Sequence, residues 1–367
     1  MPIGFLLHRQ PTAAAEAIAT ALYRSLLGRE PDRAGLEGKV ALLQSGWTLD
    51  QLIENFMESP EFRARMIRTL VPRAELPDLT RMMPEKYQLP SKPGERPLYV
   101  PQSDHDITLM DSLIRKHRYY DRFSVWSPVI ELDKEIIAAI VRGLGARSCF
   151  ELGCFTGSVL SLLAQAGIDV VGMDVSHSAF AFAYPNIRDS IVFGDLLAVD
   201  IHRRFDVVLC MDVLEHISPL HLDEYIAKLG SILEDDGYIY LNSPMFGRDP
   251  VFGITAEPDL ASWRAIGDAS YWRHWPCDVM GWPEHGHLIW ASANWWHNKF
   301  AAHGLERDVA IEQAIHRRLD TFFDQGAPGR RSLFVLRKPT ARKSTAKVVV
   351  AVDAALASLP GLPRKAR

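Results

Sequence analysis

The chain has 367 residues, 47% of them apolar, with a formal net charge of −4 and an isoelectric point near 6.4. This length allows two domains, and the apolar content allows a sizeable core. The acidic balance argues against a protein that coats nucleic acid. The four cysteines lack metal-ligand spacing, no stretch approaches the ~20 apolar residues of a membrane span, and the first residues lack the pattern of a signal peptide. We therefore expect a cytoplasmic protein with reduced cysteines.

The first part of the chain has a helical pattern. Apolar residues recur at three- and four-residue spacing over 18–27, 36–43 and 52–56. This period predicts three helices, and Gly28 is placed to end the first. We predict a small all-α domain over residues 1–72.

The rest of the chain changes character twice. Residues 73–110 hold many prolines and mixed charge, and we predict a linker there. Strands and helices then alternate over 111–339, which predicts a parallel sheet covered on both faces. The predicted strands lie near 148–152, 169–174, 190–193, 205–211, 237–242, 305–311 and 332–338, and the main helices near 111–123, 158–166, 220–233 and 292–303.

Two further segments stand out. A stretch at 245–290 is rich in tryptophan and proline, and its rings either stack on an acceptor molecule, form a lid over it, or pack a small core. The tail, 340–367, is basic. We expect a solvated end there, with a short helix that contacts a membrane surface or a partner as the alternative.

Acidic residues follow four of the predicted strands. An apolar run ends in Glu151, and Gly153 and Gly157 follow before a helix of small residues. This strand, glycine turn and helix N-terminus suit a nucleoside-bearing cofactor. Asp174, Asp195 and Asp212 end later strands. Since the ends of parallel strands face one crevice, we predict that these acids meet there, with Asp174 accepting both ribose hydroxyls.

This constellation resembles the class I S-adenosylmethionine-dependent methyltransferases over about residues 115–338. Four segments match the family motifs in order, in the form seen in ubiquinone-biosynthesis-like members: Glu151–Gly157, Gly172–Asp174, Phe193–Leu196 and Phe205–Ile217. The resemblance implies a Rossmann-like, seven-stranded sheet with a reversed final hairpin, preceded by the all-α domain. It also implies S-adenosylmethionine as the cofactor and methyl transfer as the reaction.

The resemblance also implies roles for single residues. Glu151 would meet the methionine end of the cofactor, Val175 and Leu196 would lie against the adenine, and Met211 would line the pocket below the sulfonium. The implied cofactor contacts are Glu151, Gly153, Cys154, Thr156, Gly157, Asp174, Val175, Asp195, Leu196, Met211 and Asp212. Cys154 and Phe155 stand where many members carry a second glycine, which predicts a reshaped methionine pocket.

A hydroxyl acceptor needs a general base, and two histidines are candidates. His216 follows the strand that ends at Met211, and His287 precedes the helix at 292–303. Either side chain can instead serve packing. Asp212, Glu215 and His216 also resemble a metal-assisted pattern in some quinone-pathway relatives, and hard cations prefer such oxygen ligands. The sequence alone leaves open whether Asp212, Glu215 and His216 bind a metal ion.

Two other functions share some of these motifs. A nicotinamide dehydrogenase shares the strand and loop, but its fingerprint needs three glycines, and this loop has only Gly153 and Gly157. An inactive scaffold that binds S-adenosylmethionine is a further alternative. The presence of Glu151, Asp174 and Asp195 argues against it.

The N-terminal domain bears on the acceptor. Residues 22–36, 45–46 and 59–63 resemble a helical domain of unknown function in bacterial surface-layer, surface-glycan and glycosyltransferase-linked proteins. This company favours O-methylation of a saccharide in surface-glycan biosynthesis, and a glycan-assembly protein as a partner of the domain. A quinone-like or other small phenolic acceptor is the alternative.

Overall fold

The computed structural model describes residues 12–59, 61–62, 65–66, 76–90, 95–121, 129–254, 274–360 and 362. The chain divides into two compact units, one over 1–72 with 126–129 and the other over 73–125 with 130–367. Each unit has its own buried core.

The N-terminal unit is helical, as its spacing predicts. Its elements are α1 (Thr12–Leu22), the π-helical turn η1 (Tyr23–Leu27), α2 (Arg33–Gln44) and α3 (Leu49–Met57). Gly28 ends η1 with a φ of +70°, a conformation that suits glycine. Tyr23 and Phe56 are buried with their rings edge to face at 4.9 Å, which ties the first helices to α3.

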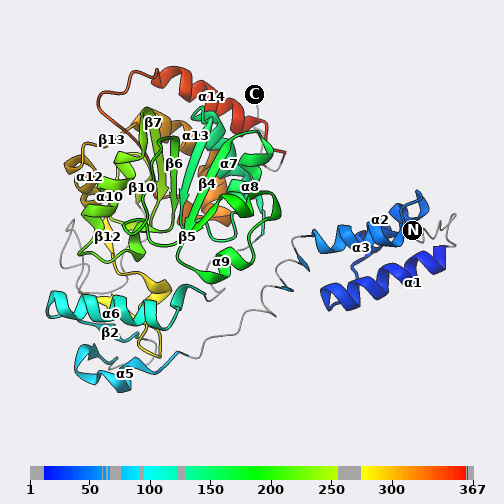
Figure 1. The fold of residues 1–367 in the computed structure, drawn as a ribbon, viewed down its shortest axis with the longest axis horizontal. Coiled ribbons are helices and arrows are strands. Elements are labelled where there is room, and N and C mark those ends of the chain that lie inside the picture. Colours follow the sequence, from blue (N-terminus) through cyan, green and yellow to red (C-terminus); the bar gives the residue numbers. More distant parts are fainter. Residues whose placement is uncertain are drawn as a thin grey trace. The chain divides into compact units, whose positions relative to one another are not determined.

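The second unit is built on a seven-stranded sheet in the order β13-β14-β7-β6-β3-β4-β5 (Figure 1). The five strands from β7 to β5 are parallel, and β14 runs antiparallel to both β7 and β13. This confirms the predicted Rossmann-like sheet with its reversed strand near the chain end. The bounds are β3 (Ser148–Leu152), β4 (Asp169–Asp174), β5 (Ile191–Phe193), β6 (Phe205–Met211), β7 (Leu233–Asn242), β13 (Glu306–Arg307) and β14 (Leu333–Arg337).

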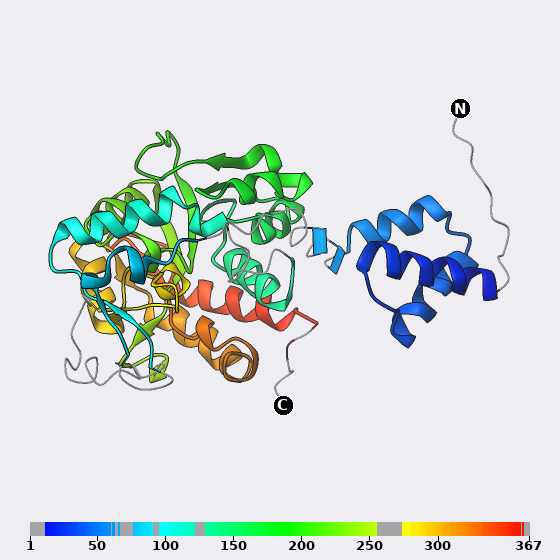
Figure 2. The same ribbon diagram turned by 90° about the horizontal axis from the view of Figure 1, so that it is seen from below.

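Helices lie on both sides of the sheet (Figure 2). Apolar side chains of α10 and α12 share one core with residues of β3, β6, β7 and β14. A second group of helices, α7, α8, α13 and α14, pack on one another. The bounds are α7 (Leu132–Gly143), α8 (Ser158–Gln165), α9 (His177–Ala181), η4 (Pro185–Ser190), η5 (Leu214–His216), α10 (Leu222–Ser231), α12 (Ala293–Ala302), α13 (Val309–Gly326), η7 (Pro328–Arg330) and α14 (Thr345–Ala357).

Two sequence predictions need correction. The strand expected near 305–311 covers only β13, because Asp308 accepts a hydrogen bond from the Ile311 amide and begins the 18-residue helix α13. The helix expected at 111–123 is α6 (Asp104–Lys116), which begins seven residues earlier at a capping box and is followed by the short turn η3 (Tyr119–Asp121).

Where a linker was expected, the chain forms a folded arm, which we define as residues 76–121. It contains α5 (Leu79–Met82), η2 (Pro84–Lys86), β1 (Tyr87–Gln88), β2 (Leu98–Tyr99), α6 and η3. Strand β2 pairs with β1 and with β11 (Trp275–Pro276), so the arm and the tryptophan-rich stretch share one small sheet. The other described elements between residues 245 and 292 are β8 (Met245–Phe246), β9 (Arg248–Asp249), β10 (Gly253–Ile254), η6 (Glu284–Gly286) and β12 (Ala291–Ser292).

The described tryptophans serve mainly as core. Trp275 and Trp282 have no exposed surface and pack with arm residues, and Tyr99 stacks on Trp275 at 5.3 Å. Trp296 is also fully buried, in the main core. Trp263 and Trp272 lie outside the described residues. The packing interpretation therefore holds for at least these three rings.

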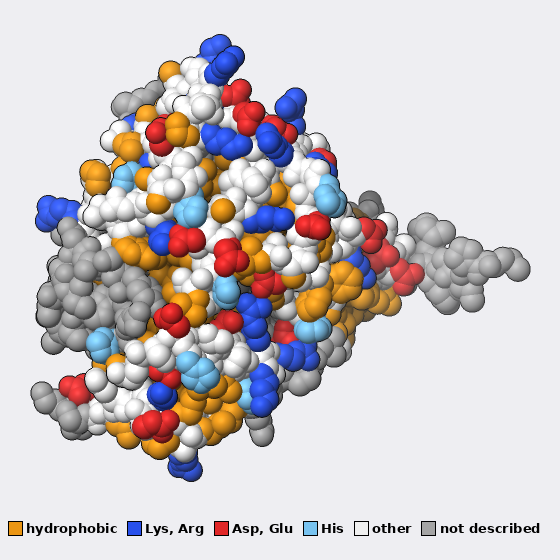
Figure 3. Space-filling view, turned by 60° about the vertical axis from the view of Figure 1, so that its left-hand side comes forward, with side chains coloured by type: hydrophobic (Ala, Val, Ile, Leu, Met, Phe, Trp, Pro, Cys, Tyr) orange, Lys and Arg blue, Asp and Glu red, His pale blue; other side chains and the backbone are white. Residues whose placement is uncertain are grey.

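Surface features agree with the sequence composition. On the face shown in Figure 3, acidic and basic side chains of the described residues are interspersed. None of the helices in the described ranges has the length and apolar character needed to cross a membrane. The tail was expected to be a solvated end, and this is wrong for the part that forms α14. Val348, Val352 and Leu356 on this helix are buried, and the helix packs on α7 and α13.

A glycine marks the close approach of α14 to α7. A Cβ atom on Gly143 would lie 2.6 Å from the Cα of Val352, which is backbone and cannot rotate away. We expect Gly143→Ala to lower the free energy of unfolding by about 1–3 kcal/mol, the range for an overpacked site. Gly230→Ala in α10 is the control, since in the described part of the chain no atom beyond its neighbours and its own helix backbone lies within 4 Å of its added Cβ. Urea unfolding of both variants tests this, and equal stability would contradict the close packing.

Candidate functional site: the carboxyl edge of the sheet

The loop after β3 is shaped by residues with positive φ. Gly153, Phe155 and Gly157 have φ of +69°, +47° and +71°. A Cβ on Gly153 would lie 2.3 Å from Val213, and one on Gly157 would lie 2.4 Å from Ile187. The glycines are thus required by protein packing, whatever ligand the loop holds.

Cys154 occupies a position that sequence reasoning did not foresee. Its side chain is buried, and its Sγ lies 2.7 Å from where a Cβ on Gly172 would be. The thiol therefore packs between the loop and β4. Thr156 and Met211 are also buried, and Leu196 has no exposed surface in the main core. The cofactor contacts assigned to these four residues stay predictions.

Asp174 holds the turn that follows β4. One of its carboxylate oxygens accepts a hydrogen bond from the Phe155 amide at 2.8 Å, and the other from the Ser176 amide at 2.7 Å. Burial raises the pKa of Asp174 to about 6, against these amides, which lower it. The side chain thus joins the loop after β3 to the turn after β4, at the edge where a ribose was predicted.

The surroundings of Glu151 show whether the site suits a cationic ligand. Its side chain is 3% exposed, and within the described residues its Oε2 has no hydrogen-bond partner. Burial, and then the nearby charge of Asp174, raise the pKa of Glu151 well above its usual range. Native proteins rarely leave such an acceptor unpaired. The ammonium group of S-adenosylmethionine is a donor of the right charge, so these residues fit this cofactor.

The predicted adenine side has exposed apolar surface. Val175 is 46% exposed and Phe193 is 47% exposed, with the ring of His177 4.5 Å from that of Phe193. The Asp195 carboxylate accepts hydrogen bonds from Tyr225 Oη at 2.5 Å and Arg115 Nη1 at 3.0 Å. Phe193 and His177 were not assigned roles from the sequence, although Phe193 lies within a motif segment.

Asp212 follows β6 directly and has a strained conformation with a φ of +53°. Its amide donates to the Asn242 carbonyl at 2.9 Å, and its carboxylate pairs with Arg330. Arg330 also donates to Asn242 Oδ1 at 2.6 Å. Burial raises the pKa of Asp212, and Arg330 opposes this. Sequence reasoning missed Arg330, which lies 118 residues beyond Asp212.

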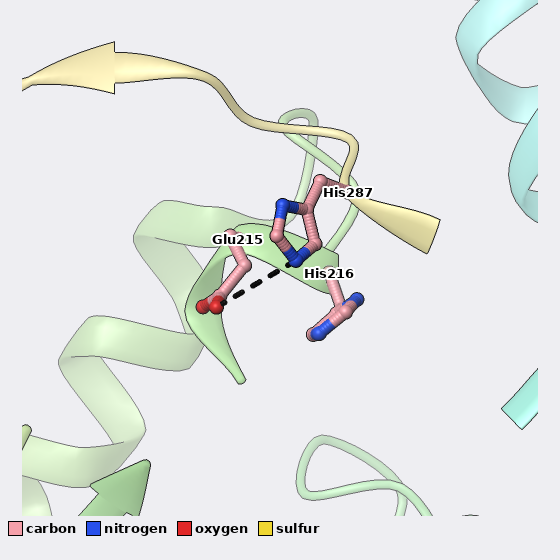
Figure 4. Close-up of side chains that lie close together, drawn as sticks. All are labelled: Glu215, His216 and His287. Atoms are coloured by element: carbon pink, nitrogen blue, oxygen red, sulfur yellow. Dashed lines mark ion pairs between the residues drawn. The ribbon is translucent and has the colours of Figure 1, made fainter. Parts of the chain in front are cut away.

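The two candidate bases lie together, beside a buried acid (Figure 4). The rings of His216 and His287 are 4.7 Å apart, edge to face. Glu215 has no exposed surface; its Oε2 accepts from Ser243 Oγ at 2.9 Å, and its Oε1 lies 4.0 Å from His287 Nε2. The structure therefore brings both predicted histidines to one place and adds Glu215 to them.

Burial sets the charge of this group. It lowers the pKa of His216 to about 4 and the pKa of His287 well below its usual range, so both imidazoles are neutral near pH 7. Burial, and then the charge of Asp212, raise the pKa of Glu215. His287 Nδ1 is buried and has no hydrogen-bond partner in the described part of the chain. A neutral imidazole with a nitrogen left unpaired is a competent proton acceptor.

The same three side chains could hold a metal ion. Glu215, His216 and His287 each offer a ligand atom, and these atoms lie within 4.8 Å of one another. Imidazole and carboxylate ligands suit Zn²⁺ and similar cations. Compared with the pattern read from the sequence, His287 stands in place of Asp212, whose carboxylate is paired with Arg330.

Three features fit a class I S-adenosylmethionine-dependent methyltransferase: the open, mostly parallel sheet, the acids at its carboxyl edge, and Glu151, whose Oε2 has no hydrogen-bond partner within the described residues. Comparison with known families agrees: residues 118–309, just over half of the chain, match a family described as a methyltransferase domain, and the chain belongs to it. Residues 10–66 match a domain of unknown function (DUF4214), which confirms the second resemblance.

Curated relatives match about a third of this chain. A ubiquinone biosynthesis O-methyltransferase of Nitrosomonas europaea is 26% identical over 145 residues, 36% of this chain and 60% of the relative. One from Azoarcus sp. is 31% identical over 127 residues, 31% and 54% of the two chains. The chain thus spans about half the length of the curated relatives it matches. A sugar N-methyltransferase structure from Streptoalloteichus is 20% identical, with a TM-score of 0.38, over 56% of this chain and 86% of that one.

The pKa of Asp174 gives a prediction for cofactor binding. Only the ionised carboxylate can accept from both ribose hydroxyls while holding its backbone amides. We therefore expect the affinity for S-adenosylhomocysteine to fall as the pH decreases through about 6. Calorimetry at several pH values measures this. Asp174→Asn should weaken binding and lose this pH dependence, whereas Asp169→Asn, at the start of the same strand, should retain it. An Asp174→Asn variant with the wild-type profile would contradict the placement.

The metal question has its own test. If His287 acts as a base, methyl transfer proceeds after chelation, because the proton acceptor is the imidazole itself. We expect turnover to be unchanged after dialysis against EDTA. Loss of turnover in EDTA and its recovery with added Zn²⁺ or Mg²⁺ would instead make Glu215, His216 and His287 metal ligands.

Proposed function

We propose that this protein transfers the methyl group of S-adenosylmethionine to a hydroxyl oxygen of a saccharide in bacterial surface-glycan biosynthesis. The observation that carries the oxygen acceptor is the neutral pair of His216, which is partly buried, and His287, which is buried. An amine needs no base once it is neutral, whereas a sugar hydroxyl must lose its proton as the new bond forms.

The chain's residues have separate tasks in this proposal. Glu151 holds the methionine end of the cofactor and Asp174 holds its ribose, and the cofactor supplies a methyl group already activated on a sulfonium. His287 Nδ1 takes the proton of the acceptor hydroxyl as the oxygen–methyl bond forms and the sulfur–methyl bond breaks. Glu215 Oε1 lies 4.0 Å from His287 Nε2, and the positive charge of the imidazolium favours the ionised form of Glu215, against the burial that raises its pKa. Alignment of the two reactants supplies most of the remaining rate enhancement.

The choice of a saccharide rests on the N-terminal domain. Its sequence resembles a domain found in surface-glycan and glycosyltransferase-linked proteins, and a glycan-assembly protein is the partner that we propose for it. The curated relatives are named for ubiquinone biosynthesis, which supports a phenolic acceptor as the second candidate.

Labelled cofactor distinguishes these candidates. The protein is incubated with methyl-labelled S-adenosylmethionine and either nucleotide- and lipid-linked sugar precursors or a set of quinone-precursor phenols, and the products are analysed by mass spectrometry. We expect label in the sugar pool. Label in the phenols alone would contradict the saccharide, and cofactor binding without transfer in either pool would favour the inactive scaffold.

Substitution of the histidines tests the base. We expect His287→Ala to lower kcat by about 10²–10⁴-fold, the usual contribution of a general base, with unchanged affinity for S-adenosylhomocysteine. His216→Ala should have a smaller effect, because its ring supports His287 by contact. His285→Asn is the control, since His285 is exposed on the same turn and asparagine tolerates its positive φ of +56°. Wild-type turnover in His287→Ala removes this residue from the mechanism.

A further inference from the structure

The turn that carries His287 is strained, and one carbonyl in it accepts two hydrogen bonds. His285 and Gly286 have φ of +56° and +80°. The Gly286 carbonyl accepts from Tyr120 Oη at 3.1 Å and lies 3.2 Å from His216 Nδ1. A positive φ suits Gly286, whereas for His285 it is unfavourable and persists only because the surroundings enforce it. This carbonyl therefore joins the arm to one histidine of the pair and precedes the other by one residue.

Two tyrosines of η3 cover the turn. A Cβ on Gly286 would lie 2.8 Å from ring carbons of both Tyr119 and Tyr120, so the rings pack directly on the glycine backbone. Tyr119 Oη donates to the Pro283 carbonyl at 3.3 Å, and the Tyr120 ring lies edge-on to His216 at 5.2 Å. The two side chains thus fasten the turn at its start and at its end.

The arm is itself tied to the cofactor edge of the sheet. Arg115 pairs with Asp195 at 3.0 Å, and Asp121 accepts a hydrogen bond from Ser176 Oγ at 2.7 Å. Tyr120 adjoins Asp121 and lies between these ties and the histidine pair. A segment of seven residues, 115–121, therefore connects the predicted adenine and ribose positions with the proposed base.

We infer that Tyr120 is a positioning residue for the His216–His287 pair. Its hydroxyl holds the Gly286 carbonyl where His216 Nδ1–H donates to it, and this hydrogen bond selects the Nδ1–H tautomer of His216. A fixed His216 ring, 4.7 Å from that of His287, then fixes the face of His287 that meets the acceptor. The inference rests on the proposed function, because it takes His287 as the base. Tyr120 itself contacts neither reactant in this account.

The test compares Tyr120→Phe with Tyr119→Phe, which removes the neighbouring hydroxyl and its bond to Pro283. Long-range ¹H–¹⁵N spectra of the imidazoles report the tautomers, calorimetry reports S-adenosylhomocysteine affinity, and thermal melting reports folding. We expect the wild type and Tyr119→Phe to show His216 as the Nδ1–H tautomer. Tyr120→Phe should show a tautomer mixture, with unchanged cofactor affinity and a kcat lower by about tenfold to a hundredfold, the scale for a misplaced catalytic group.

Several outcomes overturn the inference. An Nε2–H tautomer of His216 in the wild type does so without any variant, and this result decides the matter if Tyr120→Phe fails to fold. A Tyr120→Phe spectrum and kcat equal to those of the wild type also do so. Failure of the proposed function looks different: the tautomer changes as expected in Tyr120→Phe, but no acceptor gains a methyl group.

Discussion

The rest of the site depends on the charge of two buried acids, Glu151 and Asp174, at the ends of neighbouring strands. Burial and mutual repulsion raise the pKa of Glu151, and Asp174 is held ionisable by two backbone amides. Removing a carboxylate from water without a partner is unfavourable by several kcal/mol. Asp174 offsets this with its amides, whereas Glu151 Oε2 has no partner among the described residues. The edge of the sheet is therefore complementary to a ligand that carries a positive charge, as S-adenosylmethionine does.

The arm connects this edge of the sheet with the histidines of the proposed acceptor site. Arg115 and Asp121 tie it to residues beside the predicted cofactor position, and Tyr120 ties it to the turn before His287. The arm also pairs with β11 and shares its core with Trp275. One folded element thus supports both halves of a reaction that requires two reactants in line, and this is where alignment can contribute to the rate.

The sequence predicted what depends on local pattern. Buried parallel strands are continuous apolar runs, so β3, β4 and β6 were found within a residue of their ends, and the acids after them followed. Partners set by tertiary contact were not predicted. Arg330 reaches Asp212 across 118 residues, and the strands of the arm are two residues long. Tyr119 and Tyr120 of η3 donate to carbonyls 164 and 166 residues away. No periodicity marks such contacts, and prolines made the arm resemble a linker.

The most direct test of the pairing between Glu151 and the cofactor is calorimetric titration with two ligands. S-adenosylhomocysteine keeps the ammonium group, and 5′-methylthioadenosine lacks it. If the ammonium group pairs with Glu151, we expect one binding site per chain, tighter for S-adenosylhomocysteine than for 5′-methylthioadenosine, with the difference lost in Glu151→Gln. Equal affinities for the two ligands in the wild type, or no binding of S-adenosylhomocysteine at millimolar concentration, would contradict it.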